Sequence, residues 1–430
     1  MSDLLRYGIQ STLKLRFSPG VLIARCGEPA GEPIADVVRA AENSIEQPLD
    51  YPPLAQAAVA GDKVVLALGE TVPGAAAIVK AVVDCLLQAG IAPEDISLLQ
   101  TRQEPASSGD DPLSLVPSDV RARLRLLVHD PEDRNRLSYL AASGEGKPVY
   151  INRSLSEADL VIPIGVVRAE AAVGYYGVYG SIFPCFSDAK TIQRYRSPNV
   201  GESPVQRRRF RREVEEAGWL LGLHFLIQVV PGPGGAALGI LAGRAASIER
   251  AGREQCDRAW SCLVPRRASL VLAAVTGSAD QQTWTSVVRA LAAAERVLEE
   301  GGAIALCTDL AELPGPALQS LAAGGNPEAA LRRLAHDRPS DMLLAVEVAR
   351  ALERGPVYLL SQLAESTVEE LGLVAVANGA EVTRLADRSQ SCIVLANAQY
   401  ATPTVEDEPQ ARGAAEITEA LLEDARDQFE

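Results

Sequence analysis

Short apolar segments alternate with helical patterns along the first half of the chain. Residues 62–70 (DKVVLALGE) form an apolar run typical of a buried strand. Residues 74–91 then place Ile78, Val82 and Leu86 on one helical face and reach a glycine stop at Gly90. The pattern predicts further strands at 96–100, 124–130, 147–153, 158–167 and 223–230. Strands separated by helices indicate βα units and a mostly parallel sheet, because parallel strands need crossover helices.

A second series of the same kind begins after Pro265. It predicts a helix at 283–302 and strands at 268–277, 303–309, 355–361, 371–378 and 391–398. A length of 430 residues also favours more than one domain. We therefore predict an α/β fold with two α/β domains, 1–262 and 263–402, each built on a mostly parallel sheet. Residues 403–430 are acidic with a helical apolar stripe, and we expect a helical tail that either caps the first domain or is solvated.

Composition excludes several classes of function. The net charge of −15 argues against a nucleic-acid partner and against an anionic membrane surface. The sequence has no run of 18 apolar residues and no apolar leader, so a cytoplasmic protein is expected. The 7 cysteines are odd in number and form no CxxC pair, so we expect small buried thiols rather than disulfides or zinc ligands. Only 3 histidines are present, which disfavours a histidine-rich site.

Candidate ligand-binding segments follow the predicted strands, because open α/β sheets bind ligands beyond the carboxyl ends of their strands. They are residues 69–73, 100–103, 168–170 and 276–278. A glycine-rich loop at 174–180 carries Tyr175, Tyr176 and Tyr179. It is either a tight turn whose tyrosines pack between domains or a binding loop in a cleft. The basic run at 207–212 precedes Glu213, Glu215 and Glu216, and this order indicates an exposed helix with i,i+4 ion pairs.

Several blocks together resemble one known family. They are RYG at 6–8, PPLAQAAVAGDKVVLALGETVPG, HDPED at 129–133, GKPVYINRSLSEADLVIPIGVV, VGYYGVYGSIFPCFSDAKTI, ALGILAGRAASIERAG at 237–252 and VVRALAAAERVLEEGGAIAL at 287–306. Their order and spacing over about residues 5–400 resemble the nickel-dependent lactate racemases. The resemblance implies two α/β domains with the active site in the cleft between them. It also implies racemisation of a 2-hydroxy acid with a nickel pincer cofactor attached to a lysine. Two histidines would act as acid and base on the two faces of the substrate, and a third would help to hold nickel.

The chain departs from that family at its functional positions. Arginine stands at one catalytic histidine (Arg102), and glutamate stands at the other (Glu170). Glycine replaces the cofactor lysine (Gly180), and arginine replaces the nickel histidine (Arg196). In the family's first motif, which corresponds to residues 69–73, this chain keeps only the threonine (Thr71) and the proline. In the second half, Ser286 and Arg289 align with the family's glutamine and lysine.

These substitutions argue against the family chemistry. Glycine offers no amine for the cofactor link, and arginine stays protonated, which makes it a poor base and a poor nickel ligand. The remaining histidines do not restore the site, because His129 lies outside the catalytic motifs, His224 is expected in the core and His336 in a solvent-facing loop. We therefore expect no nickel pincer cofactor, no metal and no catalytic residue at the family positions. An active 2-hydroxyacid racemase or epimerase is the alternative.

The substitutions also suggest what the cleft does instead. Arg102, Arg196 and Arg289 would bring three guanidinium groups toward one cleft beside Glu170, and arginine suits carboxylates and phosphates. We therefore predict a site for a small anionic metabolite, lined by these residues and by Thr71, Tyr175, Tyr176, Tyr179 and Ser286. The alternative is that the arginines pair with Glu70, Glu170 or Asp188 and hold a closed interface. The sequence does not identify the ligand or the oligomeric state.

Overall fold

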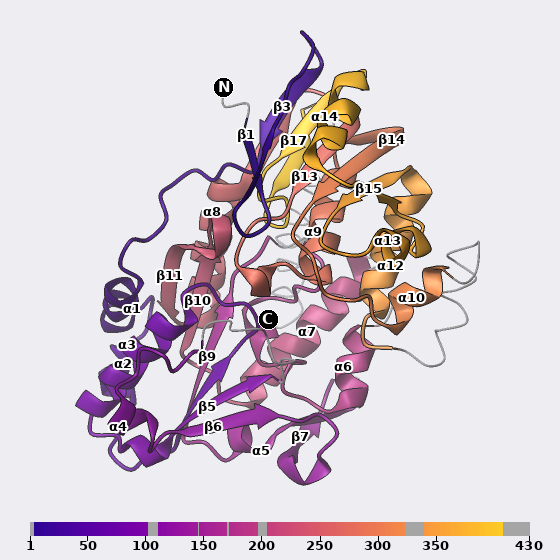
Figure 1. Ribbon diagram of the computed structural model, residues 1–430. Helices are drawn as coiled ribbons and strands as arrows, with labels where there is room; N and C mark the ends of the chain where they lie inside the picture. The colour runs from indigo at the N-terminus through magenta and orange to yellow at the C-terminus, as the bar shows by residue number, and fades with distance from the viewer. Residues whose placement is uncertain are drawn as a thin grey trace, which may run out of the picture.

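The computed structural model describes residues 4–101, 111–144, 146–169, 172–196, 204–322 and 339–406. Two six-stranded sheets dominate it (Figure 1). The first has the order β11-β10-β9-β4-β5-β6, and the second has the order β16-β15-β14-β13-β17-β3. Every pairing in these sheets is parallel except that of β10 with β11. The predicted α/β class with mostly parallel sheets is confirmed.

The bounds of the strands follow the predicted runs closely. The first sheet contains β4 (Val64–Leu68), β5 (Ile96–Thr101), β6 (Arg125–His129), β9 (Leu160–Val166), β10 (Leu226–Pro231) and β11 (Ala237–Gly243). The second contains β3 (Leu22–Cys26), β13 (Ala268–Ala274), β14 (Leu298–Cys307), β15 (Val357–Leu360), β16 (Val374–Ala375) and β17 (Cys392–Leu395). Three two-stranded sheets pair β1 (Leu4–Tyr7) with β2 (Ser11–Lys14), β7 (Leu137–Ala142) with β8 (Pro148–Asn152), and β12 (Ser261–Val264) with β18 (Thr402–Val405).

The helices lie between these strands and bury their apolar faces against the sheets. They are α1 (Val37–Glu46), α2 (Leu54–Ala57), α3 (Ala75–Gln88), α4 (Ser118–Arg121), α5 (Arg153–Ser156), α6 (Ala189–Tyr195), α7 (Pro204–Leu220), α8 (Ala245–Trp260), α9 (Trp284–Glu295), α10 (Pro316–Ala322), α12 (Met342–Arg354), α13 (Glu365–Glu370) and α14 (Gly379–Arg388). Figure 1 shows α9 and α12 against the second sheet and α1 and α3 beside the first. Among the described residues, no helix has the length and apolar content needed to cross a membrane.

The structure differs from the sequence expectations at several elements. The helix predicted over 283–302 ends at Glu295, and β14 begins at Leu298, because Val297 and Leu298 turn into the core beneath α9. The strand predicted at 147–153 lies outside the large sheets, since β8 pairs antiparallel with β7. Residues 403–405 of the expected helical tail belong to β18, which pairs with β12. Residues 407–430 lie outside the described part of the chain.

The position of the N-terminal segment was not predicted from the sequence. Strand β3 pairs with β17 at the edge of the second sheet, so residues 22–26 share a sheet with residues far along the chain. Figure 1 shows the indigo β3 beside the yellow β17. The domain bounds 1–262 and 263–402 stay an expectation. They place β3 in the first domain, whereas β3 is an edge strand of the second sheet.

The expectation that the cysteines avoid disulfides is wrong for one pair. Cys26 at the end of β3 and Cys262 in β12 form a disulfide across 236 residues, with their Cα atoms 5.8 Å apart. The spacing of the cysteines could not indicate this pair, since only the tertiary fold brings β3 to β12. Cys85, Cys185, Cys256, Cys307 and Cys392 are free, and the last three are buried as expected.

Loss of the disulfide should lower the stability of the fold. We expect Cys262→Ser to lower the free energy of unfolding by about 2–4 kcal/mol, because the cross-link restricts the unfolded chain over a long loop. Denaturant unfolding of the oxidised protein measures the effect. Cys85→Ser, which removes a free and half-buried thiol, is the control and should change little. An equal effect of both variants would contradict the cross-link.

Candidate functional site

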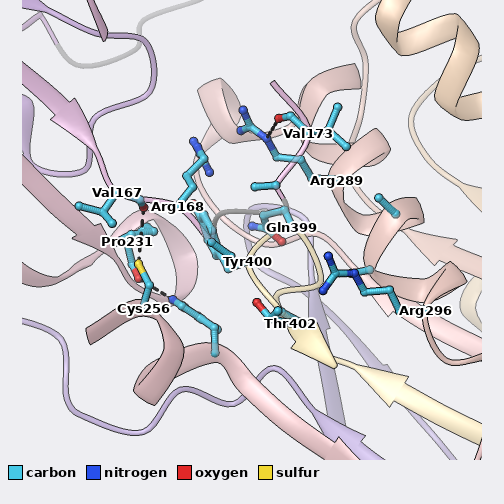
Figure 2. Close-up of a pocket in the computed structure, with 16 residues that line it drawn as sticks. Val167, Arg168, Val173, Pro231, Cys256, Arg289, Arg296, Gln399, Tyr400 and Thr402 are labelled. Carbon is cyan, nitrogen blue, oxygen red and sulfur yellow. Dashed lines mark hydrogen bonds between the residues drawn. The ribbon is translucent and has the colours of Figure 1, made fainter. Parts of the chain in front are cut away.

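A pocket lies where elements of the two large sheets meet (Figure 2). Its walls come from the segment that follows β9, from one face of α9, from the C-terminal part of α8 and from the segment that follows β17. The lining residues are Val167, Arg168, Ala169, Ala172, Val173, Pro231, Cys256, Trp260, Arg289, Ala292, Ala293, Arg296, Gln399, Tyr400, Ala401 and Thr402. The cavity measures about 50 Å³. A space of this size holds a few water molecules or one small anion.

Three arginines from separate positions in the chain line this pocket. Arg168 follows the carboxyl end of β9, where open α/β sheets bind their ligands. Arg289 and Arg296 come from α9, with Arg296 at its C-cap. They stand seven residues apart, which is about two helical turns, so both lie on the same face of the helix. The apolar face of α9, with Val287, Val288 and Leu291, packs into the core.

The three arginines have few partners among the described residues. No described carboxylate lies within ion-pair distance of Arg168, Arg289 or Arg296, and each arginine is half-buried. Nε of Arg289 donates a hydrogen bond to the carbonyl oxygen of Val173 at 3.3 Å. The guanidinium of Arg168 lies 5.9 Å from the ring centroid of Tyr400. The pocket therefore concentrates positive charge in a chain whose net charge is −15.

Burial and mutual repulsion act on these charges. Burial lowers the pKa of Arg289 well below its usual value, and the charge of Arg168 lowers it further. Burial also lowers the pKa of Arg296, with a second contribution from Arg207 on α7. Because like charges at close range disfavour one another, an anion between the arginines would relieve an unfavourable arrangement.

Of the predicted ligand-binding residues, the described structure places one in this pocket, Arg289. Arg102 and Glu170 lie outside the described residues. Arg196 is the exposed C-cap residue of α6 and is not among the residues that line the pocket. Ser286 is buried at the start of α9, where its backbone N–H donates to the hydroxyl of Thr283 at 3.3 Å. Thr71 adopts a positive φ of 51° in the turn after β4 and does not line the pocket.

Two of the three loop tyrosines have structural roles. The hydroxyl of Tyr176 donates to the carbonyl oxygen of Tyr195 at 3.1 Å, and its ring packs edge-on against that of Tyr195. Tyr179 donates to the carbonyl oxygen of Leu223 at 3.3 Å, and its ring covers Gly218 so closely that a Cβ there would clash. Tyr175 lies close to Cys256 and to the backbone of Arg168, and burial raises its pKa to about 12. The expected tyrosine walls are therefore wrong for Tyr176 and Tyr179.

The two described histidines do not supply an acid–base group to the pocket. His129 is buried, with Nε2 2.8 Å from the carbonyl oxygen of Ser187 and Nδ1 3.0 Å from the side-chain nitrogen of Asn152. Burial lowers its pKa. The expectation of a core position for His224 is wrong, because this side chain is exposed beyond the end of α7. His336 lies outside the described residues.

Of the carboxylates in the alternative where local acids neutralise the arginines, Glu70 and Asp188 are described and Glu170 lies outside the described residues. Asp188 caps α6, where it accepts hydrogen bonds from the backbone of Lys190 and from the hydroxyl of Thr191 at 2.7 Å. Glu70 is exposed and close enough to influence the pKa of Arg168, but it forms no ion pair among the described residues. The basic run on α7 does form a predicted i,i+4 pair, from Arg211 to Glu215 at 3.1 Å.

Sequence reasoning missed the residues that complete this pocket. Arg168 stands in one of the candidate segments at a strand end, but only its neighbour Glu170 was selected. Arg296 could have been found from its two-turn spacing to Arg289. Gln399 and Tyr400 follow β17 at the carboxyl edge of the second sheet, which is the position that the rule for α/β ligand sites indicates.

Comparison with known proteins shows what the chain resembles. Residues 7–204, which are less than half of the chain, match the lactate racemase N-terminal domain. The chain is 24% identical to the lactate racemase of Lactiplantibacillus plantarum over 194 residues, which cover 43% of this chain and 45% of that protein. The chain thus matches less than half the length of this curated relative.

Solved structures extend the likeness of fold to nearly the whole chain. The lactate racemase apoprotein of Thermoanaerobacterium thermosaccharolyticum superposes with a TM-score of 0.77 at 16% identity, and covers 94% of this chain and 100% of that one. A structural-genomics protein of Thermotoga maritima superposes with a TM-score of 0.60 at 13% identity, and covers 89% and 100%. These similarities show a shared lactate racemase fold.

The residues at the family positions do not fit the cofactor of nickel-dependent lactate racemases. Gly180 stands in a short 3-10 turn with no atom within 4 Å of the position of a Cβ, so nothing replaces the amine that would hold the cofactor. The side chain of Arg196 is an exposed cation. Across the described ranges, no group of three or more histidine, cysteine or acidic side chains is arranged to hold a metal ion. We therefore derive no reaction step through nickel.

Removing one pocket arginine should cost little stability. In low-salt, anion-poor buffer, we expect Arg289→Met to leave the melting temperature unchanged or to raise it. The free energy of unfolding should increase by no more than about 1 kcal/mol, because the change removes a desolvated charge and its repulsion with Arg168. Differential scanning calorimetry measures this. Arg125→Met, at an exposed position on β6, is the control. A large destabilisation by Arg289→Met alone would show that Arg289 is held by a structural ion pair instead.

Proposed function

We propose that this chain is a lactate racemase family member that binds a small anionic metabolite, a carboxylate or a phosphate, in the pocket between its two large sheets. The observation that carries the proposal is that Arg168, Arg289 and Arg296 line one small cavity without a described carboxylate partner. Guanidinium groups bind carboxylates and phosphates through paired hydrogen bonds. A partly dry pocket strengthens these bonds relative to those at an open surface.

We further propose that the protein does not carry out nickel-dependent racemisation. Racemisation of a 2-hydroxy acid needs a base for each face of the substrate. Among the described residues, those that line the pocket include no histidine, aspartate or glutamate. Burial raises the pKa of Cys256 to about 12 and also raises that of Tyr400, so neither group is a base near neutral pH. Family membership favours the alternative, an active 2-hydroxyacid racemase, and the chemistry of this pocket favours binding alone.

Binding of simple anions tests the first part of the proposal. Isothermal titration calorimetry should detect phosphate or a short hydroxycarboxylate binding to the full-length protein in low-salt buffer. Arg296→Gln should weaken this binding by about tenfold or more, because it removes one charged donor from the pocket. The exposed Arg125→Gln should bind like the wild type. Failure of all anions to bind would refute the proposal.

Metal analysis tests the second part. Protein purified from cells that produce the nickel cofactor should contain far less than stoichiometric nickel and should show no absorbance from a pyridinium-type group. Incubation with either enantiomer of lactate should leave its optical rotation unchanged. Stoichiometric nickel with measurable racemisation would establish the alternative.

A further inference from the structure

One wall of the pocket is formed by the residues that join β17 to β18. This wall segment, residues 396–402, contributes Gln399, Tyr400, Ala401 and Thr402 to the lining (Figure 2). Residues 396–401 are all buried. The ring centroid of Tyr400 lies 5.2 Å from that of Trp260 and 5.9 Å from the guanidinium carbon of Arg168. The position of the wall segment therefore determines what packs against one of the pocket arginines.

The first part of the wall segment is supported by Cys26 and by the residue after it. The backbone N–H of Ala396 donates to the carbonyl oxygen of Cys26 at 2.8 Å. The side-chain nitrogen of Asn397 donates to the carbonyl oxygen of Gly27 at 2.9 Å. Gly27 has a positive φ of 80°, and it lies so close to Ala396 that a Cβ would overlap the carbonyl oxygen of that residue. This end of the wall segment is thus in tight contact with the chain that follows β3.

The last part of the wall segment is supported by the strand that contains Cys262. The wall segment continues into β18, which pairs in parallel with β12, and Pro403 lies opposite Cys262 in that pairing. Trp260, which packs against Tyr400 and also lines the pocket, directly precedes β12. The disulfide of Cys26 with Cys262 therefore joins the supports at the two ends of the wall segment.

Of the two cysteines, Cys262 is the more accessible to a reductant. Cys26 is only 3% exposed, whereas Cys262 is half-buried between the exposed residues Ser261 and Leu263. A thiolate of a small dithiol that attacks the sulfur of Cys262 breaks the disulfide, forms a mixed disulfide with Cys262 and releases Cys26 as a thiolate. The second thiol of the reductant then displaces Cys262. The reductant ends as a disulfide, and two electrons and two protons pass to the protein.

We propose that the disulfide of Cys26 with Cys262 is a redox switch for anion binding. The inference rests on the proposed function and adds regulation of the same pocket. In the oxidised protein, the cross-link holds together both supports of the wall segment and so keeps Tyr400 beside Arg168. Reduction leaves these supports without their covalent link, so the wall segment loses part of its order before a ligand binds. Restoring that order during binding costs free energy and lowers the affinity.

Calorimetric titration of the wild-type protein with inorganic phosphate tests the switch. The oxidised protein should bind phosphate, and reduction with dithiothreitol should weaken this binding by about three- to tenfold, because a few side chains of the wall segment must then be ordered on binding. Reoxidation should restore the affinity, and a count of free thiols establishes each state. Equal affinities of the two states, or tighter binding by the reduced protein, would overturn the switch and leave anion binding intact. No binding in either state would refute the proposed function and the switch with it.

Variants assign the effect to this disulfide. Cys26→Ser combined with Cys262→Ser should bind phosphate with the affinity of the reduced wild-type protein, with or without dithiothreitol. Cys85→Ser is the matched control, because it removes a free cysteine that does not line the pocket. It should keep the full difference between the oxidised and reduced states. A redox response that persists in the double serine variant would show that another group is responsible, and would overturn the inference.

Hydrogen exchange separates a local effect from a loss of folding. Circular dichroism first establishes that the reduced protein and the double serine variant are folded. Mass spectrometry should then show faster amide exchange on reduction in the wall segment, where the backbone N–H groups of Ala396 and Ala398 are hydrogen-bonded in the structure. Strand β4, which lies in the other large sheet, should exchange at an unchanged rate. Unchanged exchange in the wall segment, or an equal increase in β4, would contradict the switch.

Discussion

The repulsion between Arg168 and Arg289 is the constraint that gives the pocket its character. Both side chains are half-buried, burial lowers the pKa of each, and no described carboxylate lies within ion-pair distance of either. A folded chain retains such an arrangement at a cost, since buried charges without a partner are unfavourable. An anion that binds between the arginines offsets this cost. Binding would therefore stabilise the protein as well as occupy the site.

The geometry of the parallel sheets brings the residues of the pocket together. Arg168 follows the end of β9 in the first sheet, and Gln399 and Tyr400 follow the end of β17 in the second. The segment that contains Gln399 and Tyr400 continues directly into β18, which pairs with β12. The disulfide of Cys262 with Cys26 then ties β12 to the end of β3. The wall of the pocket is thus fixed at several points in the second half of the chain.

The sequence predicted the class of fold and most of the strands, because buried parallel strands are short apolar runs with clear limits. It did not predict the place of β3, since the partner strand lies more than 350 residues away. The same limit explains the missed disulfide. Of the residues that line the pocket, Arg289 was predicted from its family position. Arg196 was also predicted, but it is exposed at the C-cap of α6 and does not line this pocket.

The departures from the lactate racemase pattern have a consistent physical meaning. Under the proposed correspondence of positions, the groups that transfer protons and hold nickel in the family are replaced by arginine, glutamate and glycine. Crystals grown in low salt and soaked with glycolate would test the central claim most directly. The account predicts one ligand carboxylate within hydrogen-bond distance of Arg168 or Arg289. Electron density for the ligand elsewhere, or a carboxylate of the chain seated between these arginines, would contradict it.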